Sequence, residues 1–207
     1  MTPQETSRRR VAAGIGIAIA ALAGAAWRNI RKEMPQHGPT EMPHRVGRTW
    51  RVSEVEWHPS QTEQEAVRRL WALTFEPPDE GGPVVEMSDF RGKPLLVNFW
   101  GSWCPYCVEE MPRLNRFYAK NRANGWQLLG LAVEDSASSV QSFLRRWPVD
   151  FPIGIMQKKS GLDLMRQLNN GSGGVPFSVL FDADGEPRRR APAGAEEEDL
   201  AIWRKAL

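Results

Sequence analysis

Short apolar runs alternate with segments of helical spacing along the C-terminal part of this chain. Apolar runs of about four to eight residues bounded by turn residues are typical of buried strands, and apolar positions three and four apart are typical of helices. The expected strands are Leu70–Phe75, Pro83–Glu86, Pro94–Trp100, Gln127–Val133, Phe151–Met156 and Val175–Phe181. The expected helices are residues 104–121, 136–147, 161–168 and 196–206. This alternation predicts an α/β domain with a mixed β-sheet, and Asp182–Gly185 has the composition of a hairpin turn.

Residues 11–27 form an apolar stretch without a single charge. As a helix it would span roughly 26 Å at about 1.5 Å per residue, which is near the short limit for crossing a bilayer. Arginines occupy positions 8–10 before it, and Trp27 closes it at an interfacial position. We therefore expect a transmembrane signal-anchor. A cleaved signal peptide is the alternative, because residues 23–25 (Ala-Gly-Ala) have the small-residue spacing of a cleavage site.

The charges around this stretch do not decide its orientation, because positive residues precede it and Arg28, Arg31 and Lys32 follow it. The short N-terminal tail and the long C-terminal part favour a signal-anchor with residues 1–10 in the cytoplasm. The expected location is the cell inner membrane, crossed once, with the C-terminal domain facing the periplasm or the extracellular side.

The segment between the apolar stretch and the domain lacks hydrophobic periodicity. Residues 33–60 are rich in Pro, His and Glu, which is typical of a flexible tether. Ser60 and Glu63 have the spacing of a capping box, which predicts a short helix through about Leu70. We therefore assign residues 28–69 to a tether and residues 70–207 to the globular domain.

Composition restricts the possible chemistry. The formal net charge is only +2, which gives no reason to expect nucleic-acid binding. The chain has two cysteines, too few for a disulfide-stapled fold, and its three histidines lie far upstream of them, so a tetrahedral zinc site is not expected. The basic run Arg188–Arg190 is interpreted as a solvated hairpin arm, with a docking patch for an acidic partner as the alternative.

The two cysteines lie three positions apart, between a predicted buried strand and a predicted helix. A thiolate at a helix N-terminus faces the positive end of the helix dipole, so the pKa of Cys104 is expected to fall below the ordinary value of about 8.5. Pro105 suits the first helical turn, where its missing N–H is tolerated. We expect Cys104 to be the exposed nucleophile and Cys107 the resolving thiol. A purely structural disulfide, and half of a metal site completed by a partner chain, remain alternatives.

Several groups of residues together match one known pattern. They are Asn98–Leu114 around the cysteines, Phe90–Lys93 before the strand, Gly174–Pro176, and Leu180–Gly185. The chain resembles the TlpA/ResA-like branch of the thioredoxin superfamily over about residues 70–206. The resemblance implies a thioredoxin-like fold, in which helices flank a central mixed β-sheet, and thiol–disulfide exchange through the cysteine pair with no other cofactor and no bound metal.

The resemblance also implies roles for single residues. Pro176 matches the cis-proline that faces the cysteine pair in this superfamily, where the backbone of Val175 would pair with an extended substrate segment. Trp103, Pro105 and Tyr106 would contact substrate beside the sulfurs. Glu110 matches the acidic residue that handles the proton of Cys107, and a solvated helix carboxylate is its alternative. Asn98 stands where ordinary thioredoxins carry a buried Asp.

The expected function is the reduction of disulfides in protein substrates, with the enzyme re-reduced by a membrane dithiol electron donor. The opposite direction stays open, because Pro105-Tyr106 departs from the dipeptides frequent in this branch and the reduction potential falls anywhere between about −270 and about −120 mV. A copper-handling module for oxidase assembly is a second hypothesis, based on Met34, Met42, His37 and His44 in the tether. A thiol peroxidase is a third.

Overall fold

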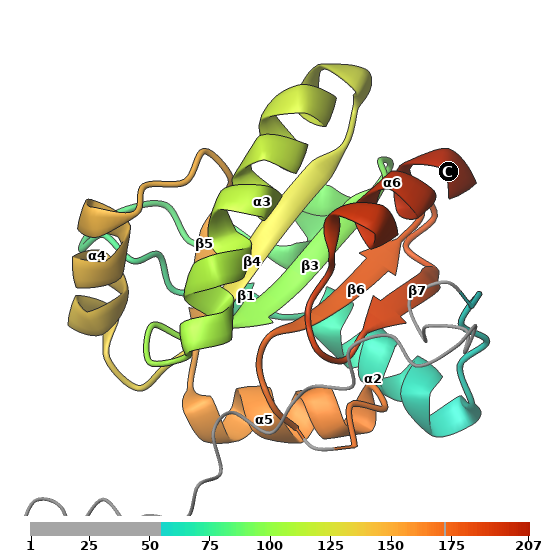
Figure 1. Ribbon diagram of the computed structural model, residues 1–207. Coiled ribbons are helices and arrows are strands. Elements are labelled where there is room, and N and C mark those ends of the chain that lie inside the picture. Colours follow the sequence, from blue (N-terminus) through green and yellow to red (C-terminus); the bar gives the residue numbers. More distant parts are fainter. Residues whose placement is uncertain (1–54, 172) are drawn as a thin grey trace, which may run out of the picture. The chain divides into compact units, whose positions relative to one another are not determined.

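The computed structural model describes residues 55–171 and 173–207 (Figure 1). The elements in chain order are α2 (Gln61–Trp71), β1 (Thr74–Phe75), β2 (Val85–Glu86), η2 (Met87–Phe90), β3 (Leu95–Trp100), α3 (Pro105–Asn121), η3 (Arg122–Asn124), β4 (Gln127–Val133), α4 (Ala137–Arg146), β5 (Ile153–Met156), α5 (Lys158–Gln167), β6 (Phe177–Phe181), β7 (Pro187–Ala191) and α6 (Glu197–Ala206). The predicted strand at residues 127–133 is confirmed without change, and most other predicted elements differ by one to three residues at their ends.

A five-stranded sheet with the order β5-β4-β3-β6-β7 forms the centre of the domain. β4 runs parallel to both β3 and β5, and β6 runs antiparallel to both β3 and β7. Every residue of β3 and β6 is buried, which explains why these strands are apolar on both faces rather than alternating, apart from Asn98 and Ser178. The predicted mixed sheet is therefore confirmed.

Helices cover both faces of this sheet, and each face has its own hydrophobic cluster (Figure 1). Leu95, Val97 and Phe99 of β3 join the cluster that includes α2 and α5. Leu96 and Trp100 join the cluster that includes α3, α4 and α6. This division follows from the period of two along a strand, which points successive side chains to opposite faces. Each helix is thus held by an apolar face against a rigid strand surface.

The domain begins earlier in the chain than the predicted boundary at Leu70. The capping box is present, because Ser60 N–H donates to Glu63 Oε2 at 2.6 Å and Glu63 N–H donates to Ser60 Oγ at 3.4 Å. The helix α2 continues through Trp71, and it buries four apolar side chains at helical spacing, namely Ala66, Val67, Leu70 and Trp71. The predicted strand at residues 70–75 is therefore reduced to Thr74–Phe75, since the helix takes its first residues.

The segment before α2 packs against the last strand of the sheet. Trp57 N–H donates to the carbonyl oxygen of Arg188 at 2.7 Å, and the Trp57 side chain is buried, with the Arg190 guanidinium 5.0 Å from its ring centre. Arg190 also pairs with Glu63, and Arg188 pairs with Asp182 at 2.6 Å. Residues 188–190 lie on a hairpin arm as predicted, but they are half-buried rather than solvated, because Arg188 and Arg190 contact the start of the domain.

The predicted membrane segment, residues 11–27, and the predicted tail, residues 1–10, lie outside the described residues. Among residues 55–171 and 173–207, no helix is long and apolar enough to cross a membrane.

Candidate active site

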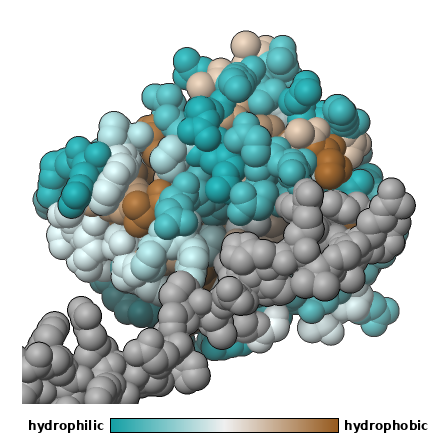
Figure 2. Space-filling view, in the orientation of Figure 1, coloured by the Kyte–Doolittle hydropathy of each residue, from teal (hydrophilic) through white to brown (hydrophobic). Residues whose placement is uncertain are grey.

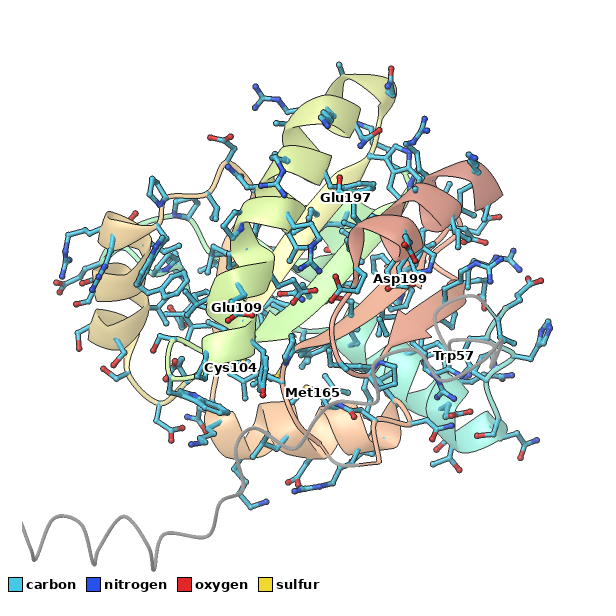
Figure 3. The ribbon with its side chains drawn as sticks, in the orientation of Figure 1. Trp57, Cys104, Glu109, Met165, Glu197 and Asp199 are labelled. Atoms are coloured by element: carbon cyan, nitrogen blue, oxygen red, sulfur yellow. A yellow bond between two sulfur atoms is a disulfide. The ribbon has the colours of Figure 1, made fainter. Side chains whose placement is uncertain are left out.

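The two cysteines lie where β3 passes into α3, and Figure 3 shows Cys104 at the N-terminal end of this helix. Cys104 is the N-cap residue, with extended backbone, and Pro105 occupies the first turn as predicted. Cys104 and Cys107 form a disulfide whose Cα atoms are 5.3 Å apart. The backbone N–H of Cys107 donates to Cys104 Sγ at 3.2 Å. This N–H and the helix dipole favour negative charge on Cys104 Sγ once the disulfide is opened.

Both cysteines are buried in this disulfide form. Cys104 is 3% exposed and Cys107 is 1% exposed, so the expectation of an exposed Cys104 is wrong for this state. The physical reason is that Cys104 faces two neighbours at once. Its Sγ is bonded to Cys107 on one side and lies 3.5 Å from the carbonyl oxygen of Val175 on another.

Val175 and Pro176 approach the disulfide from a segment far away in the sequence. The Val175–Pro176 peptide bond is cis, which confirms the predicted isomer. Pro176 is buried, whereas Val175 is half-buried. Asn170 Nδ2 donates to the carbonyl oxygen of Gly174 at 2.7 Å and so fixes the residue that precedes Val175. The structure therefore brings the predicted Val175–Pro176 segment to the predicted cysteine pair.

Three predicted contact residues surround the disulfide on the outside. Trp103 is 49% exposed, Tyr106 is 42% exposed, and Pro105 is exposed as well. The Trp103 ring lies over the backbone of Gly101, so close that a Cβ at this position would be 2.7 Å from ring atoms. Lys158 Nζ lies 4.6 Å from the centre of the same ring, a cation–π contact. Figure 2 shows a mostly hydrophilic surface over α3 and α6, and Trp103 and Tyr106 are the two aromatic residues among the exposed large hydrophobic side chains of the described residues.

Glu110 is buried rather than solvated, at 3% exposure. Its Oε1 accepts the backbone N–H of Ala195 at 2.6 Å, and its Oε2 accepts Asn98 Nδ2 at 3.2 Å. Burial raises the pKa of Glu110 to about 7, against the lowering effect of these two hydrogen bonds and of the nearby Arg113. Glu110 lies three positions after Cys107 on the buried face of α3, where residues three apart are neighbours.

Asn98 connects Glu110 to the centre of the sheet. It is fully buried on β3, and its Nδ2 also donates to Ser178 Oγ on β6 at 3.0 Å. Its Oδ1 is buried and has no hydrogen-bond partner among the described residues.

The loop before α6 contacts Glu110 through Gly194 and Ala195. No local pattern in the sequence identifies this loop as part of the site. Besides its N–H bond to Glu110, Ala195 accepts Arg113 Nη1 at 2.9 Å through its carbonyl oxygen, and Glu196 pairs with Arg113 at 2.8 Å. A Cβ at Gly194, whose φ is +88°, would be 2.9 Å from both Glu110 Oε1 and Pro176 Cγ. Gly194 therefore permits the carboxyl group and the proline ring to lie side by side.

Glu134 is a second residue that sequence reasoning missed. It is buried at the end of β4, and its Oε1 accepts both the backbone N–H of Ser102 at 2.7 Å and the hydroxyl of Ser102 at 2.6 Å. The carboxylate thus fixes the loop two residues before Cys104. In the sequence, the only indication of this role is the position of Glu134 directly after an apolar strand.

The described residues contain no group of three or more His, Cys, Asp or Glu side chains that could hold a metal ion. The Met and His residues on which the copper hypothesis rests lie outside the described residues, so that hypothesis stays untested.

The AhpC/TSA family pattern matches residues 71–197, which include the whole site described above. The chain belongs to the AhpC/TSA family. Among its relatives, the thiol-disulfide oxidoreductase ResA of Bacillus anthracis is 31% identical over 136 residues, which are 66% of this chain and 76% of that protein. ResA of Bacillus thuringiensis subsp. konkukian is 29% identical over 136 residues, which are also 66% of this chain and 76% of that protein. The predicted resemblance and the predicted enzyme class, a thiol–disulfide oxidoreductase, are confirmed.

Solved structures agree on the fold. A secreted disulfide oxidoreductase of Mycobacterium tuberculosis, described as homologous to E. coli DsbE, superposes with a TM-score of 0.55 at 23% identity and covers 69% of this chain and 98% of its own. A thiol:disulfide interchange protein of the thioredoxin family from Chlorobium tepidum gives 0.54 at 23% identity, covering 65% and 92%. The predicted thioredoxin-like fold is confirmed.

Proposed function

We propose that this protein is a membrane-anchored, extracytoplasmic oxidoreductase that reduces disulfides in protein substrates and is re-reduced by a membrane dithiol donor. The observation that carries the exchange chemistry is the Cys104–Cys107 disulfide at the N-terminus of α3, opposite the Val175 carbonyl group. The anchor rests on the apolar residues 11–27 and their flanking arginines.

In the reduced enzyme, Cys104 is the nucleophile. Its thiolate, stabilised by the N–H of Cys107 and the helix dipole, attacks one sulfur of the substrate disulfide, and the other substrate sulfur leaves as a thiolate that takes a proton from solvent. Cys107 then attacks Cys104 Sγ. The Cys104–substrate bond breaks, and the second substrate sulfur leaves with the electron pair and takes a second proton from solvent. The substrate gains two electrons and two protons, and the enzyme becomes the disulfide form described here.

Glu110 acts in the second step. Cys107 is buried one helical turn away from it, so water has little access to the thiol proton that must leave before Cys107 can attack. A carboxyl group with a pKa of about 7 accepts this proton at neutral pH and releases it when the donor system reduces the enzyme again.

One charged group near the pair, Glu110, favours the reductive direction, whereas the helix N-terminus at Cys104 acts against it. A reduced form with stabilised thiolates makes a strong oxidant, whereas a buried carboxylate near Cys107 disfavours thiolate there and so favours the disulfide. Glu110 occupies this position, and its ionised form therefore lowers the reduction potential of the pair.

The substrate is expected to bind as an extended segment along Val175, flanked by the exposed Trp103 and Tyr106. Aromatic side chains supply contact area at little cost in conformational entropy, and main-chain hydrogen bonds to Val175 would not depend on substrate sequence.

Cysteine trapping tests the order of attack. The Cys107→Ser variant is expected to accumulate mixed disulfides with substrate proteins through Cys104, because the step that releases them is lost. The matched Cys104→Ser variant should trap none. Mass spectrometry of the trapped peptides identifies the linked cysteine, and adducts that require Cys107 rather than Cys104 would overturn the assignment.

A further inference from the structure

The Asn98 side chain occupies an unusual position between Glu110 and Ser178. Its Nδ2 uses both hydrogens, one toward Glu110 Oε2 at 3.2 Å and one toward Ser178 Oγ at 3.0 Å. Its Oδ1 is buried without a partner among the described residues. A buried acceptor without a hydrogen bond destabilises the folded state, and an apolar side chain would avoid the loss. The amide therefore calls for an explanation beyond packing.

Only one of the two carboxyl oxygens of Glu110 can carry a proton without opposing a backbone N–H. Oε1 accepts the N–H of Ala195 at 2.6 Å, and a backbone N–H can only donate. The charged groups nearby, Arg113 on α3 and Glu196 before α6, act on the carboxyl group as a whole. When Glu110 takes up a proton, the proton is therefore placed on Oε2, the oxygen that faces Asn98.

When Oε2 is protonated, Glu110 needs a hydrogen-bond acceptor from Asn98 instead of a donor. An N–H of Asn98 suits an ionised Oε2 but opposes an O–H on the same atom. A half-turn of the amide presents Oδ1 instead, with almost unchanged shape, and Ser178 can follow because a hydroxyl donates as readily as it accepts.

We propose that Asn98 is a positioning residue whose side-chain amide rotates with the protonation state of Glu110, so that the carboxyl group keeps its place while it gains and loses the Cys107 proton. This inference rests on the proposed function, since it assumes that Glu110 exchanges a proton with Cys107. An Asp at position 98 would place a second carboxyl group against Glu110, and a Leu would offer it neither donor nor acceptor.

The Asn98 amide itself reports the rotation. In the disulfide form of the full chain, where the cysteines do not titrate, NMR should show the Asn98 Nδ2 hydrogens close to the Glu110 carboxyl group above the midpoint of its resonance, near 7, and turned away from it below that midpoint. The Glu110→Gln variant should abolish this change, and Glu109→Gln, an exposed neighbour on the same helix, should leave it intact. Asn98 resonances that stay constant while Glu110 titrates would overturn the proposal.

A substitution gives a second readout. Because the rotating amide offers a hydrogen bond to both protonation states, Asn98→Leu should leave the pKa of Glu110 near its wild-type value, whereas loss of a fixed donor would raise it. Asn121→Leu, which removes another buried asparagine of α3, should leave that pKa unchanged. A clearly raised pKa of Glu110 in Asn98→Leu would show that Asn98 is a fixed donor and would contradict the inference alone. If instead Glu110→Gln leaves the pH profile of thiol exchange unchanged, the proposed role of Glu110 itself fails.

Discussion

At the scale of single residues, the site depends on groups whose charge is controlled by where they are buried. Glu110 has almost no contact with solvent, and only Asn98 and the Ala195 N–H donate hydrogen bonds to it among the described residues. The same burial that makes it a proton acceptor near neutral pH also makes its ionised form unfavourable for the fold. Function and stability are thus coupled through one carboxyl group.

This coupling predicts a particular dependence of stability on pH. The pKa of Glu110 is about 7 in the folded protein against an ordinary value of 4.5, so the folded state binds the proton more tightly than the unfolded state does. The free energy of unfolding should therefore be greatest below the ordinary pKa and fall as pH rises through 7. The loss is on the order of 2 to 3 kcal/mol between about pH 5 and pH 8, because a tenfold difference in proton affinity between the two states corresponds to about 1.4 kcal/mol.

Glu110→Gln removes this titration. Relative to the wild type, the variant should gain on the order of 2 to 3 kcal/mol in unfolding free energy between about pH 5 and pH 8. Denaturant unfolding of the disulfide form at each pH measures the difference, with the exposed Glu109→Gln as the control that follows the wild type. Parallel curves for wild type and Glu110→Gln would show that the carboxyl pKa is not raised.

The sequence could identify the residues of the site that carry recognisable local patterns. Cys104, Cys107, Pro105 and Glu110 follow from the helix N-terminus and the matched motif. The partners that tune them could not be found in this way. Ala195 lies 85 positions from Glu110, and Glu134 lies 32 positions from Ser102. Such contacts arise only when the sheet places distant loops together, and no local pattern marks a backbone N–H as a partner.

At the scale of elements, buried strands are easier to predict than the N-terminal boundary of the domain. β4 has an apolar run after Gln127 and matches its prediction without error, whereas the short helix predicted from the capping box is assigned to the tether although α2 belongs to the domain. The reason is that α2 presents only a narrow apolar face, and its partners, the apolar side chains of α5 and Arg190 on β7, are far away in the sequence. Trp57 likewise lies in a segment of tether composition, and its burial depends on Arg188 and Arg190.

The packing of α2 makes a measurable contribution to stability. Leu70 is fully buried in the cluster that joins α2 and α5 to the sheet, so Leu70→Ala should lower the free energy of unfolding by about 2 to 5 kcal/mol. Val84 is 51% exposed and serves as the matched control, with an expected change within about 0.5 kcal/mol. Guanidinium chloride denaturation measures both. Equal stability of Leu70→Ala and Val84→Ala would mean that α2 does not belong to the cooperative domain.

At the scale of the whole molecule, the proposed anchor determines where the chemistry takes place. If residues 11–27 stay attached and cross the bilayer, the full chain should remain in the membrane fraction after alkaline carbonate washing, and its N-terminal peptide should be present by mass spectrometry. Added protease should digest the domain in spheroplasts with an intact inner membrane. A shorter chain beginning near residue 26 in the soluble periplasmic fraction would support the cleaved signal peptide instead.

The direction of electron flow is also a property of the whole molecule, because a reductase must transfer electrons to its substrates and still be reduced by its donor. Neither the cysteine pair nor the fold determines this direction, since oxidants and reductants use the same exchange steps. The charges nearest the pair do bear on it. The N-terminus of α3 stabilises a thiolate on Cys104, and the buried Glu110 opposes one on Cys107.

The equilibrium of the Cys104–Cys107 pair with glutathione measures the balance of these effects directly. Reduced and oxidised protein are separated after thiol alkylation across a series of ratios of reduced to oxidised glutathione. We predict a reduction potential below about −220 mV, in the range of reducing members of the thioredoxin superfamily. A potential near about −120 mV, typical of a strong oxidant, would contradict the proposal that this protein reduces its substrates.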